Sequence, residues 1–172
     1  MPLLTPKLGF PAESSSDATI LILGSMPGEM SLTAQQYYAH PRNVFWKILS
    51  EVFDFDIGLD YSQRLRQLKL QKIALWDVLQ SCERIGSLDS NIVKQTEVAN
   101  DFAGFFKQHK QLKRICFNGG KARDAFNKHV LNRHLKFKQQ FDFYALPSTS
   151  PAHAAMNYET KLLHWRKALF DV

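Results

Sequence analysis

The sequence has 172 residues, of which 45% are hydrophobic and 22% are charged, and its formal net charge is +6. This length predicts one domain with a sizeable core, and the composition excludes a disordered chain. No apolar run approaches the ~20 residues of a membrane helix, and residues 1–17 lack the apolar stretch of a signal peptide, so we expect a cytoplasmic protein without a membrane partner.

The chain begins with a segment rich in proline and serine, residues 1–17, which we expect to be flexible, and residues 18–172 are predicted to form the single domain. Short apolar runs then alternate with amphipathic stretches. Strands are predicted at Thr19–Leu23, Ile73–Leu79, Leu112–Asn118 and Phe137–Leu146, the last as a strand or hairpin arm ended by Pro147.

Helices are predicted between these strands from apolar residues at helical spacing. The first should follow Asn43, which stands at an N-cap position. The last should bury Leu162, Leu163, Leu169 and Phe170. The predicted helices cover residues 44–53, 61–70, 98–109, 120–131 and 158–170.

Strands that alternate with helices predict an α/β fold with a mainly parallel sheet covered on both faces. Polar clusters follow three of the predicted strands, at residues 24–43, 77–90 and 146–153. Because the carboxyl ends of parallel strands meet at one edge of a sheet, we expect these clusters to form a single active site.

The charge is distributed unevenly along the chain. Residues 1–60 hold three basic and seven acidic residues, whereas residues 107–138 hold ten basic residues and only Asp124 as an acid. Such asymmetry is typical of a protein that binds a polyanion, but it equally fits a solvated face with charges spread around it. The sequence leaves both interpretations open.

Metal and nucleophile chemistry receive little support. Cys82 and Cys116 are too few for a zinc or iron–sulfur site and are expected to be small buried hydrophobes. The histidines lack metal-ligand spacing, so we expect no metal site. Residues 148–150 with His153 could suggest a serine–histidine pair, but the flanking prolines favour a rigid, hydroxyl-rich loop of the kind that contacts phosphates.

Two further segments have two interpretations each. Gly119-Gly120-Lys121 follows a strand and opens a helix, so its N–H groups could hold a phosphate, although an ordinary strand-to-helix turn is slightly favoured. In residues 35–46, Tyr38 could stack on a nucleobase, and Asn43 could hold a water or a base edge. Alternatively, the tyrosine is half-buried and Asn43 only caps a helix.

Taken together, five motifs resemble the uracil-DNA glycosylase superfamily, and specifically its hypoxanthine-DNA glycosylase (deoxyinosine glycosylase) branch. They are GSMPG at 24–28, QYYAHPRNVFW at 36–46, ALWDVL at 74–79, GSLDS at 86–90 and LPSTSPA at 146–152. The resemblance covers about residues 20–164. It implies a three-layer α/β/α sandwich with a four-stranded, mainly parallel sheet. It also implies a monomer that excises hypoxanthine, with uracil as a second candidate, from DNA without a metal or an organic cofactor.

The resemblance also assigns roles to residues. Asn43 falls on the asparagine that this branch is thought to use in catalysis, and Tyr38 falls where the superfamily places the ring that stacks on the flipped base. Met26 stands where the mismatch-specific uracil branch has a catalytic asparagine, which disfavours uracil excision. The expected base-binding residues are Tyr38, Gly24, Ser25, Met26 and Asp77, and the expected DNA contacts are Arg42, Ser148, Thr149, Ser150, His153 and Lys121.

Asp77 has two interpretations. It could recognise the edge of the base by hydrogen bonding, or it could be a structural group at the end of a strand, which is slightly favoured. Two other functions also remain open at this point. One is a non-catalytic module of the same fold that binds damaged or single-stranded DNA. The other is an unrelated flavodoxin-like protein that binds a free nucleotide, which the lack of a phosphate loop argues against.

Overall fold

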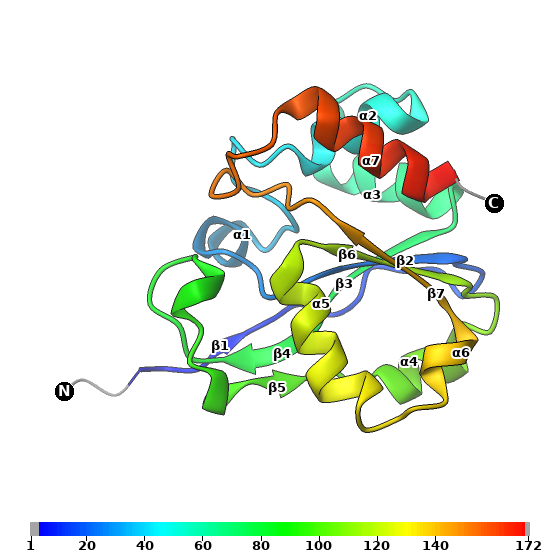
Figure 1. Ribbon diagram of the computed structural model, residues 1–172. Coiled ribbons are helices and arrows are strands. Elements are labelled where there is room, and N and C mark those ends of the chain that lie inside the picture. Colours follow the sequence, from blue (N-terminus) through cyan, green and yellow to red (C-terminus); the bar gives the residue numbers. More distant parts are fainter. Residues whose placement is uncertain (1–3, 171–172) are drawn as a thin grey trace.

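A computed structural model describes residues 4–170 of the chain. Its centre is a four-stranded sheet in the order β3-β2-β6-β7, in which every neighbouring pair is parallel (Figure 1). In this order β3 lies on one side of β2 and β6 lies on the other, so the chain extends the sheet first in one direction from β2 and then in the opposite direction. The strands are β2 (Ile20–Gly24), β3 (Ile73–Asp77), β6 (Arg114–Asn118) and β7 (Asp142–Leu146).

Helices cover both faces of this sheet, which confirms the predicted three-layer α/β/α fold (Figure 1). Alternate residues of β2 explain the arrangement: Leu21 and Leu23 belong to one core, and Ile20 and Ile22 belong to the other. One face carries α2 (Phe45–Phe53), α3 (Tyr61–Leu70) and α7 (Tyr158–Phe170), and the other carries α4 (Phe102–Gln108), α5 (Gly120–Phe126) and α6 (Phe137–Gln140).

A second, antiparallel sheet was not predicted. The chain leaves the main sheet at Val78, whose N–H donates to the carbonyl of Gly24, and continues into β4. The predicted strand 73–79 is therefore divided between two sheets, and the predicted helix 98–109 begins only at α4. The small sheet consists of β1 (Lys7–Leu8), β4 (Leu79–Cys82) and β5 (Val98–Ala99), in the order β1-β4-β5.

Residues 4–17, which the sequence predicts to be flexible, contact the rest of the domain, and residues 1–3 lie outside the described part. Besides forming β1, this segment pairs Glu13 with Leu75 through two backbone hydrogen bonds of 2.9 Å. The indole of Trp76 donates to the carbonyl of Phe10 at 3.2 Å. These contacts attach the segment to the domain through its backbone. Such hydrogen bonds were not expected from the proline- and serine-rich composition of the segment.

Three smaller expectations also need correction. Residues 137–140 form α6 rather than a strand, and the helix after Gly119 changes at Asn127–Leu131 into a π-helical segment. The buried face of α7 includes Trp165 and Leu169, whereas Leu163 and Phe170 are exposed.

Three short elements complete the described fold. Helix α1 covers Glu29–Ala34, and the 3-10 turns are η1 (Asp89–Asn91) and η2 (Lys94–Thr96).

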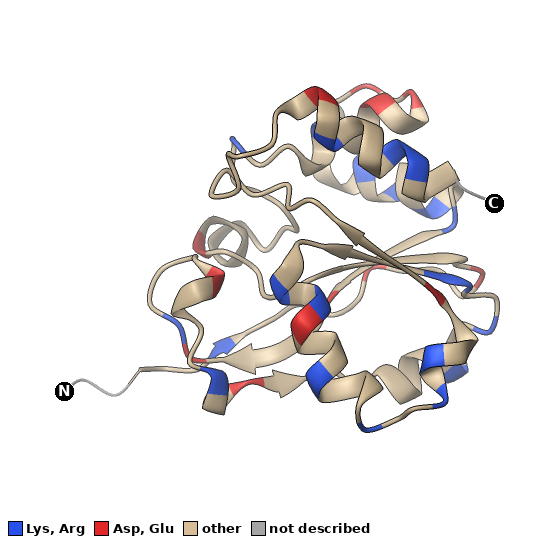
Figure 2. Ribbon diagram, viewed as in Figure 1, with Lys and Arg blue, Asp and Glu red and all other residues tan. Residues whose placement is uncertain are grey.

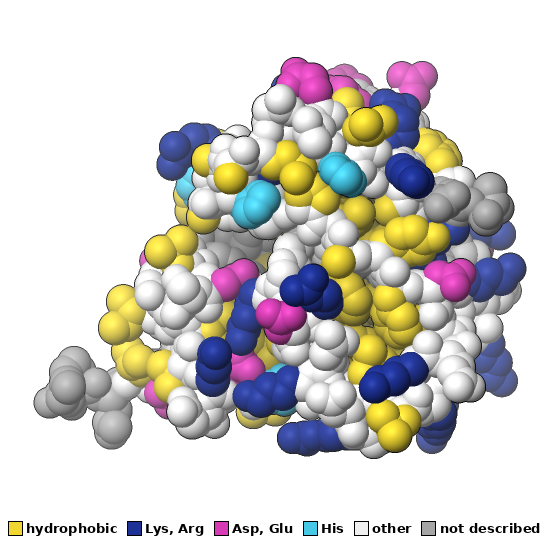
Figure 3. All heavy atoms as spheres, in the orientation of Figure 1, with side chains coloured by type: hydrophobic (Ala, Val, Ile, Leu, Met, Phe, Trp, Pro, Cys, Tyr) yellow, Lys and Arg dark blue, Asp and Glu magenta, His cyan; other side chains and the backbone are white. Residues whose placement is uncertain are grey.

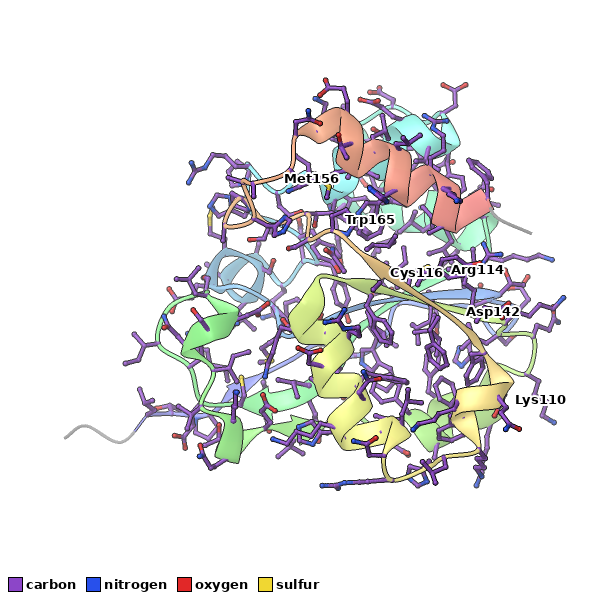
Figure 4. The ribbon with its side chains drawn as sticks, viewed as in Figure 1. Lys110, Arg114, Cys116, Asp142, Met156 and Trp165 are labelled. Atoms are coloured by element: carbon purple, nitrogen blue, oxygen red, sulfur yellow. The ribbon has the colours of Figure 1, made fainter. Side chains whose placement is uncertain are left out.

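The basic residues of segment 107–138 lie mostly away from the carboxyl ends of the strands. Lys113 and Arg114 stand at the start of β6, and Lys136 and Lys138 precede β7, so these four residues lie toward the amino-terminal edge of the sheet. Figure 4 shows Lys110, Arg114 and Asp142 at the right side of the molecule, away from Met156 in the upper middle. Lys and Arg residues are spread along the ribbon in Figure 2 and over the face shown in Figure 3, which favours the solvated-face interpretation.

Among residues 4–170, none of the helices combines the length and the apolar character that a membrane span requires. Cys82 and Cys116 are both free thiols, 1% and 0% exposed respectively, which confirms the prediction that they are buried hydrophobes.

Candidate active site

A cavity of about 920 Å³ opens at the carboxyl edge of the main sheet. It is lined by segments that follow β2, β3, β6 and β7, which is where an open parallel sheet is expected to hold its ligand. The structure brings together around it all twelve residues singled out from the sequence: Gly24, Ser25, Met26, Tyr38, Arg42, Asn43, Asp77, Lys121, Ser148, Thr149, Ser150 and His153.

The floor of the cavity depends on the missing side chain of Gly24. A Cβ atom at this position would lie 2.5 Å from Oδ1 of Asp77 and 3.2 Å from the hydroxyl of Tyr38. Only glycine lets these two polar groups approach the end of β2 so closely. The Tyr38 hydroxyl and Oδ2 of Asp77 are both buried without a hydrogen-bond partner among the described residues. Buried polar atoms are rarely left unpaired, so this floor has unused hydrogen-bonding capacity.

The carboxyl group of Asp77 holds its proton unusually strongly. Asp77 is 4% exposed, and burial, followed by the charge of Asp89, raises its pKa to about 7, while the guanidinium of Arg84 acts in the opposite direction. A large fraction of Asp77 is therefore neutral near physiological pH and can donate a hydrogen bond. The structural role that the sequence favoured for Asp77 predicts a satisfied carboxyl group, which its Oδ2 atom does not show.

The orientation of the Tyr38 ring is fixed by contacts with neighbouring residues. It stacks on the Phe45 ring with a centroid distance of 3.9 Å and an interplanar angle of 24°. Its backbone has a φ of +57°, a left-handed conformation that is uncommon for residues other than glycine. Hydrogen bonds on both sides hold this conformation: Tyr37 N–H donates to the hydroxyl of Tyr61, and Ala39 N–H donates to Oγ of Ser31. Phe45 covers one face of a rigid ring that lines the cavity.

Asn43 holds the start of helix α2 and also lines the cavity. Helix α2 begins at Phe45 with Val44 as the N-cap residue, one position later than predicted. The Oδ1 atom of Asn43 nevertheless accepts a hydrogen bond of 2.9 Å from the N–H of Phe45, and its own N–H donates to the carbonyl of His40. Because one end of the amide is held by the helix start while Asn43 lines the cavity, the side chain has a fixed orientation there.

A second wall of the cavity, residues 87–90, lies in the predicted polar cluster 77–90, but none of its residues was singled out from the sequence as a site residue. Oγ of Ser25 donates to Oδ1 of Asp89 at 2.6 Å, and the N–H of Glu29 donates to Oγ of Ser87 at 2.8 Å. Arg84 is 1% exposed and donates to the carbonyl of Pro27 at 2.6 Å. The GSLDS motif was the available signal for Ser87 and Asp89, whereas a fully buried arginine has no sequence signal.

The loop at residues 148–153 is held by buried contacts. Thr149 is 1% exposed, its Oγ1 accepts from Nδ2 of Asn118 at 2.9 Å, and its N–H donates to Oδ1 of the same residue at 3.0 Å. Nζ of Lys161 donates to the carbonyl of His153 at 2.6 Å. Burial therefore corrects the expectation for Thr149, whose hydroxyl anchors the loop, while Ser148 and Ser150 are partly exposed.

Gly119 lets β6 pass close to this loop. Its φ of +94° is strained for any residue with a side chain, and a Cβ atom would lie 3.2 Å from the Cβ of Ser148. The glycine at the end of β6 therefore serves both the turn into α5 and the approach of the 148–153 loop, which supports the interpretation of Gly119-Gly120 as a structural turn.

Lys121 is not a free cation. Its Nζ forms an ion pair with Glu97, whose side chain is 1% exposed and also accepts from Nε2 of His129 at 2.9 Å. Burial opposes the charge of Glu97, but the hydrogen bonds from His129 and Lys121 keep its pKa below the ordinary value. The expected contact of Lys121 with DNA is therefore modified, because its charge is already balanced by a protein carboxylate.

Met26 offers no polar side chain to the cavity and is 7% exposed, because its side chain packs in the core beneath the main sheet. In the part of the chain that the structure describes, no three His, Cys, Asp or Glu side chains come together as a metal site would require.

Known proteins with a similar sequence or fold agree on one family. Residues 11–172 match the family model described as the uracil DNA glycosylase superfamily. A relative named hypoxanthine DNA glycosylase from Methanosarcina acetivorans is 42% identical over 117 residues, which is 67% of this chain and 73% of the relative. A relative with the same name from Methanosarcina barkeri is 35% identical over 158 residues, which is 91% of this chain and 84% of the relative.

A solved structure extends the similarity to the fold. A solution NMR structure of a candidate uracil DNA glycosylase from Methanosarcina acetivorans superimposes with a TM-score of 0.79 at 34% identity. The superposition covers 96% of this chain and 97% of the other, so the two proteins share the whole domain.

Proposed function

The chain belongs to the uracil DNA glycosylase superfamily, and from that membership we propose that it removes a deaminated base, in the first place hypoxanthine from deoxyinosine, from DNA. The reaction hydrolyses the N-glycosidic bond and leaves an abasic site, as in base excision repair. The observation that carries the proposal is the single cavity shared by a rigid aromatic ring, Tyr38, and an oriented amide, Asn43.

The base must first leave the DNA stack, because duplex DNA hides the glycosidic bond. This step costs a few kcal/mol and is cheapest at a mispair. Stacking of the flipped base on the Tyr38 ring returns roughly 1–3 kcal/mol. Since Phe45 supports the back of this ring, the stacking surface needs no reorganisation when the base arrives.

The chemistry then depends on Asn43. By analogy with other glycosyl transfers, the sugar develops oxocarbenium character while negative charge grows on the departing base. The Asn43 amide holds the attacking water and directs it toward C1′. Backbone N–H groups of residues 24–28 stabilise the charge on the base. Because Met26 supplies no polar group at this position, we assign hypoxanthine rather than uracil as the preferred base.

The DNA backbone is held at the rim of the cavity. Arg42 and His153 are exposed there, and the hydroxyls of Ser148 and Ser150 are of the type that contacts phosphates. Thr149 and Lys121 act indirectly, Thr149 by holding its loop and Lys121 through its ion pair with Glu97. We infer a monomer that acts in the cytoplasm without metal or organic cofactor and leaves the DNA strand uncut.

The comparisons give less support to the two other functions that the sequence left open. A non-catalytic DNA-binding module is not favoured, because both curated relatives carry the name of a glycosylase. A flavodoxin-like nucleotide-binding protein was a wrong alternative, since the family match covers residues 11–172.

The proposed function is tested with labelled single- and double-stranded oligonucleotides that carry hypoxanthine, xanthine or uracil opposite each normal base. After incubation, hot alkali cleaves any abasic site. We expect alkali-dependent cleavage at hypoxanthine, weaker cleavage at uracil, and no cleavage before alkali. Tight binding to the lesion without any base release would instead establish the non-catalytic module.

A further inference from the structure

Asp77 is the buried group that the mechanism above leaves without a task. It ends β3 and lines the cavity, and a Cβ atom added to Gly24 in the floor would lie 2.5 Å from its Oδ1 atom. Its Oδ2 atom is buried and accepts no hydrogen bond within residues 4–170. An unsatisfied buried carboxyl oxygen costs free energy of folding, so its retention in a cavity points to a ligand that satisfies it.

The titratable and charged groups around Asp77 come from four parts of the chain. Tyr37 and Tyr38 approach from the segment before α2, Tyr61 belongs to α3, Asp89 belongs to η1, and Arg84 follows β4. Arg84 is the cation of this set, and its guanidinium already donates to the carbonyls of Pro27 and Gly86. With burial and Asp89 outweighing Arg84, Asp77 is protonated over much of the neutral pH range.

A deaminated purine offers the matching acceptors. The Hoogsteen edge of hypoxanthine, like that of guanine, presents N7 and O6, both of which accept a hydrogen bond or a proton. A pyrimidine such as uracil has no counterpart of N7. An acid fixed in the cavity floor therefore distinguishes the two classes of base by chemistry and not only by size.

We propose that Asp77 is the general acid of this site and that it protonates N7 of a flipped deaminated purine as the glycosidic bond breaks. This inference rests on the proposed function and deepens it, because it assigns deaminated purines as the substrate class. The proton passes from the Asp77 carboxyl group to N7, and the electron pair of the C1′–N9 bond goes to N9. The base leaves neutral, the water oxygen bonds to C1′, the water proton goes to solvent, and solvent protonates Asp77 again.

The decisive experiment compares deoxyinosine with 7-deaza-deoxyinosine, which has carbon in place of N7, in otherwise identical duplexes. Single-turnover excision is measured for the wild type and Asp77→Asn, an isosteric variant that cannot give up a proton. General acids contribute roughly 10²–10⁴-fold. We expect a loss of this order for Asp77→Asn on deoxyinosine, a similar loss for the wild type on 7-deaza-deoxyinosine, and little further loss when the two changes are combined.

Three outcomes would overturn the assignment. They are equal excision of both substrates by the wild type, unchanged excision of deoxyinosine by Asp77→Asn, and equal losses on both substrates in that variant. In each case hypoxanthine release by the wild type would leave the proposed function intact. If the wild type released no hypoxanthine at all, the proposed function itself would fail, so the two failures are distinguishable.

A measurement on the wild type alone guards against misfolding of the variant. Excision of deoxyinosine should fall as the pH rises above about 7, because Asp77 then loses its proton, whereas excision of 7-deaza-deoxyinosine should not show this decrease. Asp89→Asn is the matched variant: removing the neighbouring charge should move the decrease to lower pH while the preference for N7 remains. The same pH dependence on both substrates would contradict the role of Asp77.

Discussion

The two edges of the parallel sheet carry polar residues for different purposes. At the carboxyl edge, side chains from several loops meet around one cavity, and the Tyr38 hydroxyl and the Asp77 carboxyl lie buried there without partners in the described chain. Charges at this edge are of both signs, since Arg42 and Lys121 line the same cavity as Glu29 and Asp89. The chemistry of this edge comes from placement rather than from net charge.

The amino-terminal edge holds much of the excess positive charge. Lys110, Lys113, Lys136 and Lys138 lie in segments that lead into β6 or β7 and are solvent-exposed. Arg114 is used within the fold, because its Nη1 donates to the carbonyl of Ala168 at 2.7 Å. The comparison teaches that a charge count along the sequence does not locate a polyanion site, whereas the ends of parallel strands do.

The largest effect is expected at Asn43. Asn43→Ala should lower single-turnover excision of hypoxanthine by roughly 10²–10⁴-fold, because the attacking water loses its positioning group. The variant also removes the hydrogen bond to the N–H of Phe45, which should cost about 1 kcal/mol of stability. Asn43→Ser restores a hydroxyl acceptor for that N–H without the amide. Full activity in the serine variant would show that Asn43 only caps the helix.

Asp77 should produce the next largest effect, in this case on stability. Its pKa rises from 3.8 to about 7 in the folded protein, so its stabilising neutral form is fully present below pH 3.8 and is lost as the pH rises through 7. Relative to Asp77→Asn, which cannot ionise, the wild type should lose roughly 2–3 kcal/mol of unfolding free energy between pH 5 and pH 9. Urea unfolding of both proteins at the two pH values measures this difference. A constant difference would mean that Asp77 is ionised in the fold.

Tyr38 should show an intermediate effect on catalysis. Replacing its ring by leucine removes stacking worth roughly 1–3 kcal/mol, which corresponds to about a 5- to 150-fold loss in excision. Tyr38→Phe keeps the ring and deletes a buried hydroxyl that has no partner among the described residues, so it should retain activity and fold at least as stably. If leucine and phenylalanine behaved alike in the excision assay, the ring would have no stacking role.

Local sequence signals predicted the elements that bury a regular pattern. The bounds of α3 and α7 agree with prediction, and β2, β3 and β6 were found because their apolar runs are largely buried on both faces. The small sheet was missed because β1 and β5 have two residues each and carry no periodicity. Helix α6 was mistaken for a strand because Phe137 and Phe141, four residues apart, give too short a pattern to identify its period.

The site was predictable only where a motif supplied the residues. Strand ends and motifs gave the twelve cavity-lining positions, but neither indicates how a side chain is used. The burial of Thr149, the ion pair of Lys121 with Glu97, and the contact of Arg84 with Pro27 join segments far apart in the sequence. Such contacts arise from tertiary packing, which no local pattern encodes.

A smaller effect is expected at the rim. Arg42 is exposed, lines the cavity and has no carboxylate partner within residues 4–170. Arg42→Ala should weaken binding to lesion DNA several-fold while leaving the single-turnover rate at saturating enzyme nearly unchanged. It should also reduce the slope of log affinity against log salt by about one, because one phosphate contact releases about one counterion. An unchanged slope would remove Arg42 from the DNA interface.

The smallest effect is expected at the amino-terminal edge of the sheet. Replacing Lys110 and Lys113 together by alanine removes two exposed cations from this edge, which is opposite the edge that holds the cavity. Because DNA held at the opposite edge gains only a screened, long-range attraction from them, affinity and salt slope should change by less than they do in Arg42→Ala. Both are measured by titrating lesion DNA at several salt concentrations. A reduction in slope of about two would mean that the DNA also contacts the amino-terminal edge, and the separation of roles between the two edges would no longer hold.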